Sequence, residues 1–570
     1  MATLNAALQP PAVVVLGPGA LATAQRVKAL YAGARIHALQ DRAQGDIAFS
    51  ELGEHLRELY RRGTPLIALC AAGIVIRCLA PLLANKGIEP PVLALAEDGS
   101  AVVPLLGGLT GVNVMAREMG AALGIAPAIT TSGELRFGTC LLNPPEGYAL
   151  ASLAQGKRFV SDLLAGDTTR IDGDAPWLDN VDLPRDAAAS HAIRVSPQAW
   201  DGNPEHLVIH PRSVVACATE APALLAEYVR EALQANGVAE QALAVLIAPA
   251  VHMGDAAFEQ AASALGVPLR FVDGDVFGAL KLPEPHRRLE AGHGIVLGVA
   301  DEPLDVSRLG RARGRLTVLG LGPGRADLLT PMARTALDEA TDIVGYATYV
   351  EMAGPLRPGQ VRHATDNREE LQRARHAFEL ASEGRRVAVV SSGDPGVFAM
   401  AAAVLEALEG AEDSRWHRVD LRIVPGVSAA LATAAQVGAP LGHDFCMLSL
   451  SDNLKPWAVI EKRLHHAALA DLVMAFYNPI SRARPWQLDR ALEIVRAVRA
   501  PETRVVLGRD VGRPGESLRA TTLGALQSSD VDMRTMVIVG SSATRGFSRE
   551  GSGDGLREWV YTPRWYAEGG

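Results

Sequence analysis

Four turns follow apolar, strand-like runs in the second half of the chain. They are residues 320–324 (GLGPG), 393–396 (GDPG), 425–426 (PG) and 478–479 (NP). Glycine at a strand exit lets the backbone turn tightly and approach a ligand, and open α/β sheets bind ligands at the carboxyl ends of their strands. Each turn alone is equally typical of a structural loop. Four in this order predict a ligand site.

The elements that would position these turns alternate along the whole chain. Residues 12–16, 66–70 and 92–95 are apolar runs expected to form strands, and residues 20–32 have a helical pattern. Strands that alternate with helices favour parallel sheets covered on both faces. We therefore expect a multidomain α/β protein.

Bulk composition narrows the class further. At 570 residues the chain exceeds one hydrophobic core, and its net charge of -9 disfavours nucleic acid as a partner. The five cysteines form no CxxC pair, so we expect neither a disulfide framework nor a metal site. No run approaches the roughly 20 apolar residues that span a bilayer, and no signal peptide is evident. We expect a cytoplasmic enzyme without a membrane partner.

Composition shifts predict the domain limits. Asp, Pro and Gly cluster between residues 166 and 204, and Asp, Pro, Gly and Arg between residues 301 and 313. Such clusters are typical of connectors. The expected organisation is an α/β domain over residues 1–165, a connector over 166–204, a second α/β domain over 205–300, a linker over 301–313 and a further domain over 314–570. Within the connector we expect one short strand at residues 193–195 (IRV).

Several motifs in the last of these domains carry a family resemblance. They are residues 344–349 (VGYATY), 439–445 (APLGHDF), 449–452 (SLSD), 455–457 (KPW) and 561–564 (YTPR). With the four turns and residues 535–544 (TMVIVGSSAT), they make residues 314–564 resemble the tetrapyrrole methylases. The stretch 439–457 is most similar to the precorrin-3B C(17)-methyltransferases of cobalamin synthesis.

The resemblance implies a two-lobed α/β fold with S-adenosylmethionine between the lobes. Uroporphyrinogen methylases often carry Asp where this chain has Ala347, after Tyr346, which argues against that specificity. By family analogy the cofactor-binding residues are Pro323, Gly393, Asp394, Val397, Ser428, Ala429, Tyr477, Thr535 and Met536.

The implied reaction moves an activated methyl group to an electron-rich ring carbon, so alignment and exclusion of water can supply most of the rate effect. Ring contraction also needs a general base, for which His443 is the first candidate and Asp452 the second. A packing histidine is the equal alternative for His443. The many carboxylates of the substrate match four cations, each of which could instead be a solvated surface charge: Lys455, Arg463, Arg482 and Arg484.

The first half resembles the CbiG-type cobalamin-biosynthesis proteins, which hydrolyse a lactone and release a two-carbon fragment. The resemblance rests on residues 71–77 (AAGIVIR), 98–106 and 129–131. Leu109 stands where that family has histidine, and residues 132–134 (SGE) replace its Ala-Thr-Asp. Leucine cannot accept a proton, so we expect a module that handles a corrinoid without hydrolysing it.

The sequence thus predicts methylation of precorrin-3B at carbon 17 with ring contraction, giving precorrin-4. Three alternatives stay open: a bifunctional cobalt-precorrin methylase and hydrolase, methylation at another ring carbon, and a first half that is only a scaffold. By analogy with family methylases we also expect a homodimer, with neighbouring enzymes of the cobalamin pathway as further partners.

Overall fold

The structure is a computed structural model that describes residues 9–83, 89–357, 359–366, 369–481, 483–548 and 558–565. The chain divides into two compact units, Met1–Ala312 and Arg313–Gly570. The second unit starts one residue before the expected limit at 314. Within the described ranges, no helix has the length and apolar character needed to cross a membrane.

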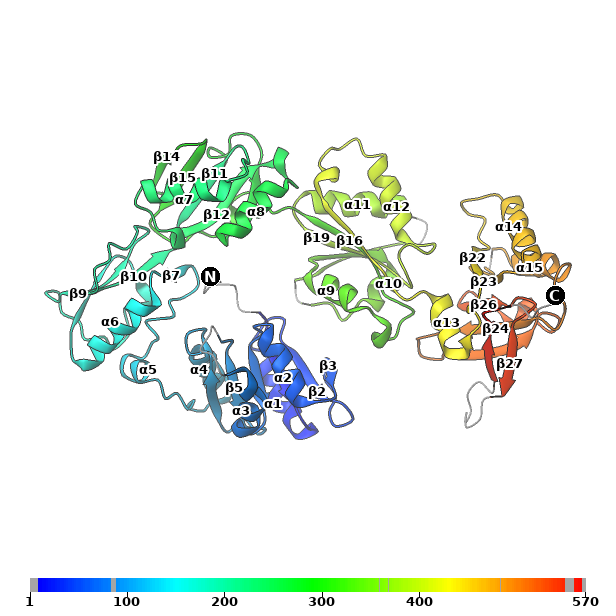
Figure 1. The fold of residues 1–570 in the computed structure, drawn as a ribbon, viewed down its shortest axis with the longest axis horizontal. Helices are drawn as coiled ribbons and strands as arrows, with labels where there is room; N and C mark the ends of the chain where they lie inside the picture. Colours follow the sequence, from blue (N-terminus) through cyan, green and yellow to red (C-terminus); the bar gives the residue numbers. More distant parts are fainter. Residues whose placement is uncertain are drawn as a thin grey trace. The chain divides into compact units, whose positions relative to one another are not determined.

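The first sheet of the first unit has six strands in the order β3-β2-β1-β4-β5-β6 (Figure 1). All pairs are parallel except β5 with β6, which agrees with the expected alternation. Its elements are β1 (Ala12–Val15), α1 (Leu21–Lys28), β2 (Arg35–Leu39), β3 (Ile47–Phe49), α2 (Leu52–Arg61), β4 (Leu66–Leu69), α3 (Ala72–Leu79), β5 (Val92–Leu95), β6 (Val102–Leu106) and α4 (Val112–Leu123).

The second sheet extends through the region where we expected a connector. Residues 166–204 contain two of its strands, which pair in parallel with each other, and one of them pairs in parallel with a third strand. The short strand expected at residues 193–195 is part of the strand His191–Val195. The strand Thr169–Asp172 was not expected, because its periodicity is too short to stand out among the turn-forming residues that flank it. The order is β7-β10-β9-β8, from β7 (Tyr148–Leu150), β8 (Thr169–Asp172), β9 (His191–Val195) and β10 (His206–Pro211), with α5 (Ser132–Phe137) and α6 (Leu153–Ala165).

A third, mixed sheet completes the first unit in the order β13-β12-β11-β15-β14. Helices α7 and α8 pack against it through the largest apolar core of the unit. The elements are β11 (Val214–Ala218), α7 (Leu225–Ala235), β12 (Leu243–Pro249), α8 (Ala256–Leu265), β13 (Leu269–Val272), β14 (His286–Glu290) and β15 (Ile295–Ala300).

The second unit has two lobes, which we call the amino lobe (residues 313–428) and the carboxyl lobe (residues 429–565). The amino lobe is an all-parallel sheet in the order β18-β17-β19-β16-β20. Helices α11 and α12 cover one face and α9 and α10 the other, because its strands are apolar on both sides. The elements are β16 (Arg315–Gly320), α9 (Pro331–Glu339), β17 (Asp342–Tyr346), α10 (Ala347–Met352), β18 (Val361–Thr365), α11 (Glu370–Ser382), β19 (Arg386–Ser391), α12 (Met400–Glu409) and β20 (Asp420–Val424).

The carboxyl lobe is mixed rather than parallel, which sequence reasoning did not anticipate. Its main sheet has the order β22-β23-β26-β24-β25, and only β22 and β23 are parallel. Helices α14 and α15 cover one face and α13 the other. The elements are α13 (Ala429–Val437), β21 (Gly438–Ala439), β22 (Phe445–Ser449), α14 (Trp457–Leu469), β23 (Val473–Tyr477), α15 (Gln487–Arg496), β24 (Arg504–Arg509), β25 (Ser517–Thr522), β26 (Thr535–Val539), β27 (Arg545–Ser548) and β28 (Glu558–Tyr561).

A buried arginine ties the carboxyl lobe together behind its sheet. The Arg499 guanidinium donates to the carbonyls of Ala468 (3.1 Å), Gly540 (2.8 Å) and Leu472 (2.9 Å), and lies 2.8 Å from the Asp471 carboxylate. These groups come from the end of α14, the start of β23 and the end of β26. Arg499 therefore satisfies the ends of three elements at once.

We predict that Arg499→Leu lowers the free energy of unfolding of the carboxyl lobe by about 3–5 kcal/mol, because it removes the cation beside the Asp471 carboxylate and the donors to the Gly540 and Leu472 carbonyls. Denaturant titration followed by tryptophan fluorescence measures it. The matched control is Arg490→Gln, which removes only the exposed ion pairs to Glu461 and Glu493 and should change stability little. Equal stability of Arg499→Leu and the native chain would contradict the assignment.

Candidate functional site

Three turns of the amino lobe meet at the carboxyl edge of its sheet. Gly322 and Gly393 exchange backbone hydrogen bonds of 3.1 and 2.8 Å across the ends of β16 and β19. A Cβ on Gly320 or on Gly426 would lie 2.2 Å from the Gly393 carbonyl oxygen, so only glycine fits there. The predicted glycine-rich turns are thus one packed backbone platform.

Asp394 holds two turns of this platform together through hydrogen bonds. Its Oδ1 accepts from the Gly396 N–H at 2.8 Å and its Oδ2 from the Gly426 N–H at 3.0 Å. Both carboxylate oxygens are therefore engaged in joining the turn after β19 to the turn after β20. Asp394 shapes the predicted cofactor site whether or not it also touches the cofactor.

The other predicted cofactor residues of this region surround the platform. Pro323 lies in the first turn and Val397 in the second, and the buried Ser428 caps α13 by accepting from the Leu431 N–H at 3.3 Å. Ala429 is the first residue of that helix. Ser391, at the end of β19, has a buried hydroxyl with no hydrogen-bond partner in the described part of the chain. An unsatisfied polar atom beside a glycine platform fits a site built for a polar ligand.

The matching edge of the carboxyl lobe collects the ends of four strands. Ser449 pairs with Tyr477 at the ends of β22 and β23, and Arg509 pairs with Thr535 where β24 ends and β26 begins. Thr535, the next residue Met536 and Tyr477 therefore share one edge, as the resemblance requires. The Tyr477 hydroxyl accepts from the Ala430 N–H at 3.3 Å.

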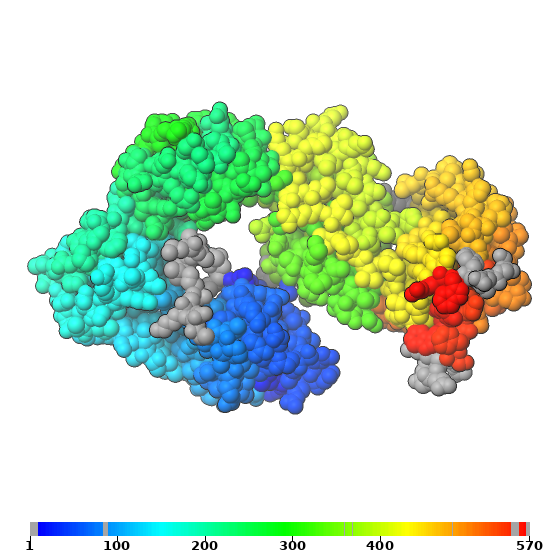
Figure 2. All heavy atoms as spheres, in the orientation of Figure 1, coloured from blue at the N-terminus to red at the C-terminus, as the bar shows by residue number. Residues whose placement is uncertain are grey.

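The two lobes touch at these edges, where an arginine of the carboxyl lobe donates to a carbonyl of the amino lobe. Figure 2 shows the atoms of the amino lobe (green to yellow) against those of the carboxyl lobe (yellow to red). The ring of Phe398, from the turn after β19, lies 5.2 Å from the ring of Tyr477 between centroids. Arg513, which follows β24, donates from Nε to the Pro323 carbonyl at 2.8 Å and from Nη2 to the Ser392 hydroxyl at 3.1 Å. The predicted cofactor residues of both lobes thus lie around one interlobe contact.

Asp452, Lys455 and Arg484 lie in the loops that leave this edge, and Arg463 lies on α14. Asp452 Oδ1 is 2.7 Å from Arg484 and accepts from the Gln487 amide at 3.0 Å, which ties the loop after β22 to the loop after β23. Lys455 and Arg463 are close enough that burial, with the charge of Arg463 added, lowers the pKa of Lys455. Arg482, the fourth predicted cation, lies outside the described residues.

His443 is not brought together with Asp452. It precedes β22 (Phe445–Ser449), whereas Asp452 follows that strand, so the two lie at its opposite ends. The His443 Nδ1 accepts from the Asp444 N–H at 2.8 Å. The structure groups Asp452, and not His443, with the turns that were predicted to bind cofactor.

Sequence reasoning missed two polar groups at this edge. Arg513 lies in residues 508–516 (GRDVGRPGE), whose glycines and proline were a signal for a sharp turn after a strand. The buried Gln487 gave no signal, since a glutamine opening a helix is ordinary. Its role depends on the neighbouring loop that supplies Asp452.

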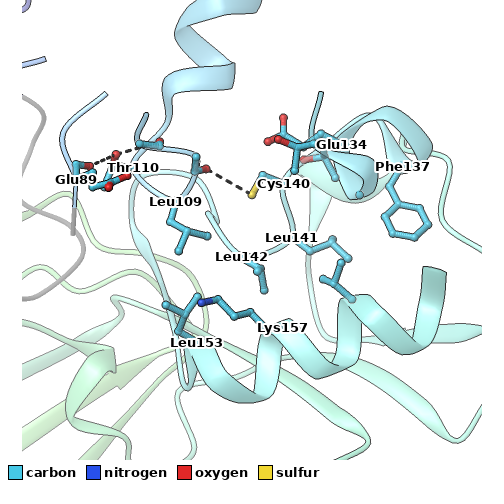
Figure 3. A pocket seen from close by; sticks show the side chains of 16 residues that line it. Glu89, Leu109, Thr110, Glu134, Phe137, Cys140, Leu141, Leu142, Leu153 and Lys157 are labelled. Atoms are coloured by element: carbon cyan, nitrogen blue, oxygen red, sulfur yellow. Dashed lines mark hydrogen bonds between the residues drawn. The ribbon is translucent and has the colours of Figure 1, made fainter. Parts of the chain in front are cut away.

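The first unit has a cavity of about 360 Å³ where the second resemblance placed its departures (Figure 3). Leu109 lies in its wall together with Leu141, Leu142 and Leu153. Buried Glu134 also lines it and is held by the side chains of Asn113 and Arg117.

The thiol of Cys140 faces the same cavity. Burial, with the charge of Glu134 added, raises the pKa of this thiol. A thiol with a raised pKa stays protonated near neutral pH and is a poor nucleophile. Leu109 carries no titratable group, so neither it nor the protonated Cys140 thiol is suited to act as a base or a nucleophile in this cavity.

Comparison with known proteins adds to this geometry. Residues 315–527 match the family model for Tetrapyrrole (Corrin/Porphyrin) Methylases, and residues 54–134 match that for Cobalamin synthesis G N-terminal. The chain is 52% identical over 254 residues to a Precorrin-3B C(17)-methyltransferase from Sinorhizobium, covering 45% of this chain and 98% of that protein. The chain belongs to the tetrapyrrole methylases.

Two further similarities concern the same part of the chain. Cobalamin biosynthesis protein CobIJ of Mycobacterium bovis is 49% identical over 269 residues, covering 46% of this chain and about half (51%) of that protein. The solved structure of the methyltransferase CobJ is 54% identical, covering 44% of this chain and 100% of that one, with a TM-score of 0.41.

The second unit of this tetrapyrrole methylase is therefore a methyltransferase of cobalamin biosynthesis, and the first carries a CbiG-like module, as the motifs predicted. The family uses S-adenosylmethionine as methyl donor. The glycine platform and the unsatisfied Ser391 hydroxyl fit a polar, closely approached ligand of this kind. Within the described ranges no group of three His, Cys, Asp or Glu side chains is placed to hold a metal ion.

We predict that Gly426→Ala disrupts the platform, because its Cβ would meet backbone atoms of Gly393 and Gly320 at 2.2 to 2.9 Å. Overpacking against backbone should cost about 3 kcal/mol, seen as a lower melting temperature in calorimetry. Gly410→Ala in the same lobe is the control, since its nearest contact would be an ordinary 3.5 Å. A Gly426→Ala variant as stable as Gly410→Ala would rule out the tight packing described.

Proposed function

We propose that the second unit methylates precorrin-3B at carbon 17 with ring contraction, giving precorrin-4. The observation that carries the proposal is the contact between the lobes, where the glycine platform meets the strand edge that holds Tyr477 and Thr535. Asp452 and Arg484 lie in the loops that leave this strand edge. The Sinorhizobium relative, whose name states this specificity, supports it at 52% identity.

Pro323, Gly393, Asp394, Val397, Ser428, Ala429, Tyr477, Thr535 and Met536 would hold S-adenosylmethionine. When bound, it supplies a methyl group activated on a sulfonium centre. The platform offers backbone N–H and carbonyl groups without side chains in the way. Phe398 and Tyr477, in contact across the lobes, would keep water from the reacting centre.

Lys455, Arg463, Arg482 and Arg484 would bind the peripheral carboxylates of the tetrapyrrole. The ion pair with Asp452 would orient the planar guanidinium of Arg484 before the substrate binds. A preoriented guanidinium can then take a carboxylate in bidentate fashion. Burial lowers the pKa of Lys455, so this lysine would lose its positive charge at a lower pH than an ordinary lysine.

For the base that ring contraction needs, we propose Asp452 ahead of His443. In the described residues the contacts of Asp452 to Arg484 and Gln487 involve Oδ1, and the proposal is that Oδ2 takes the proton from the substrate. Its place beside the shared edge favours this role, whereas His443 lies at the far end of β22. His443 remains the second candidate.

The proposal is tested by incubating the full chain with precorrin-3B and methyl-labelled S-adenosylmethionine, with mass and absorption spectra of the product. We expect one added methyl group and the spectrum of a contracted ring. Transfer only to the cobalt complex would move the substrate to the cobalt-containing series. Transfer to neither would sink this specificity. Methylation at another ring carbon would show as the added mass without the contracted-ring spectrum.

Asp452→Asn should lower kcat by about 100-fold or more, the usual contribution of a general base, while His443→Gln should lower it little. Steady-state rates for both variants measure this. The reverse order of effects would assign the base to His443.

For the first unit we propose a module that handles a corrinoid without hydrolysing it. The support is the cavity, where Leu109 has no proton to exchange, Glu134 is held by Asn113 and Arg117, and burial raises the pKa of the Cys140 thiol. The alternatives are a working hydrolase, which would make the protein bifunctional, and a scaffold that binds nothing.

We predict that the chain releases no two-carbon fragment from cobalt-precorrin-5A but quenches or shifts the absorption of the bound corrinoid. An active CbiG-type hydrolase serves as the positive control for fragment detection. Release of the fragment would establish the bifunctional alternative, and absence of both release and binding would leave the scaffold.

A further inference from the structure

We propose that Arg513 is the positioning residue that assembles the methyl-donor site across the two lobes. It belongs to the carboxyl lobe, yet its guanidinium donates to the Pro323 carbonyl (2.8 Å) and the Ser392 hydroxyl (3.1 Å) of the amino lobe. The inference rests on the proposed placement of S-adenosylmethionine at this platform.

The two acceptors come from different turns of the platform. Pro323 belongs to the turn after β16, and Ser392 precedes Gly393 in the turn after β19. Because a guanidinium is a rigid planar fork, its two donors fix the separation of the two acceptors. One side chain from the carboxyl lobe thus sets the geometry of both turns proposed to hold the donor.

The backbones on the two sides approach as closely as glycine allows. A Cβ on Gly324 would lie 2.8 Å from the Gly512 carbonyl oxygen, and one on Gly512 would lie 2.9 Å from Pro323 Cγ. Both glycines have positive φ, 142° and 77°. Arg513 therefore reaches its partners only because no side chain separates the two backbones.

The turn that carries Arg513 is itself held in place. The backbone N–H of Arg513 donates to the Asp510 carbonyl at 2.8 Å, and the Glu516 carboxylate accepts from the Gly512 N–H at 2.6 Å. The guanidinium thus projects from a closed turn at the end of β24. Its donor groups are therefore held in place before they meet their acceptors.

Arg513 acts through Pro323 and Ser392, so its loss should lower the affinity for the methyl donor and leave the affinity for the tetrapyrrole unchanged. The contrast arises because Lys455 and Arg484 lie in the loops after β22 and β23 and Arg463 lies on α14, and in the described residues Arg513 donates hydrogen bonds to Pro323 and Ser392 instead. A general loosening of the fold would weaken both ligands.

The test is calorimetric binding of S-adenosylhomocysteine to the full chain and its variants. Arg513→Gln should weaken binding about 10- to 100-fold, the range for charge-assisted hydrogen bonds. Arg513→Lys, which keeps the charge but not the fork, should lie between. Ser392→Ala should weaken S-adenosylhomocysteine binding less in the Arg513→Gln background than in the native chain, because Ser392 and Arg513 take part in the same hydrogen bond.

Arg519→Gln is the matched control, because it removes an exposed ion pair to Asp530 in the same lobe, away from the platform. Native affinity in Arg513→Gln, an equal loss in Arg519→Gln, or an equal loss of precorrin-3B affinity in Arg513→Gln would overturn the proposal. A native chain that binds no S-adenosylhomocysteine overturns the donor placement as well. Binding of S-adenosylhomocysteine without methylation of precorrin-3B overturns only the specificity and leaves Arg513 standing.

Discussion

Backbone meets backbone at the carboxyl edge of the amino-lobe sheet, where Gly320, Gly393 and Gly426 pack without side chains between them. This packing brings the ends of β16, β19 and β20 close enough for the two carboxylate oxygens of Asp394 to span the turns. A single Cβ would separate them. The surface offered to a ligand is then made of peptide groups, which hold a ligand by shape and hydrogen bonding rather than by charge.

The carboxyl lobe forms its side of the interlobe contact through the directions of its strands. Its mixed sheet places the ends of β22, β23 and β24 and the start of β26 on one edge. An antiparallel hairpin, β24 with β25, ends there in the turn that carries Arg513. Contact between the lobes therefore depends on the carboxyl lobe being mixed: the hairpin turn lies at the edge because β25 runs back from it.

The first unit lines its cavity with leucine side chains and one enclosed carboxylate. Leu109 and its leucine neighbours make the cavity wall apolar, and Glu134 is held there by Asn113 and Arg117. A carboxylate held by an arginine and an amide stabilises the surrounding loops. Packing of apolar side chains and one fixed ion pair therefore shape this part of the cavity.

Much of this protein could be read from its sequence. The glycine turns, the alternation of strands and helices and the motifs around residues 439–457 depend on local patterns, and these determined the α/β class, the methylase family and the residues that gather at the platform. The strand at residues 169–172 and the mixed sheet of the carboxyl lobe did not follow, because short strands and strand direction depend on pairing partners distant in the chain. The same holds for the site. That Asp452 meets Arg484, that His443 lies at the other end of β22, and that Arg513 reaches Pro323 across the lobes were decided only by tertiary structure, since each joins residues whose separation in sequence carries no signal of their contact.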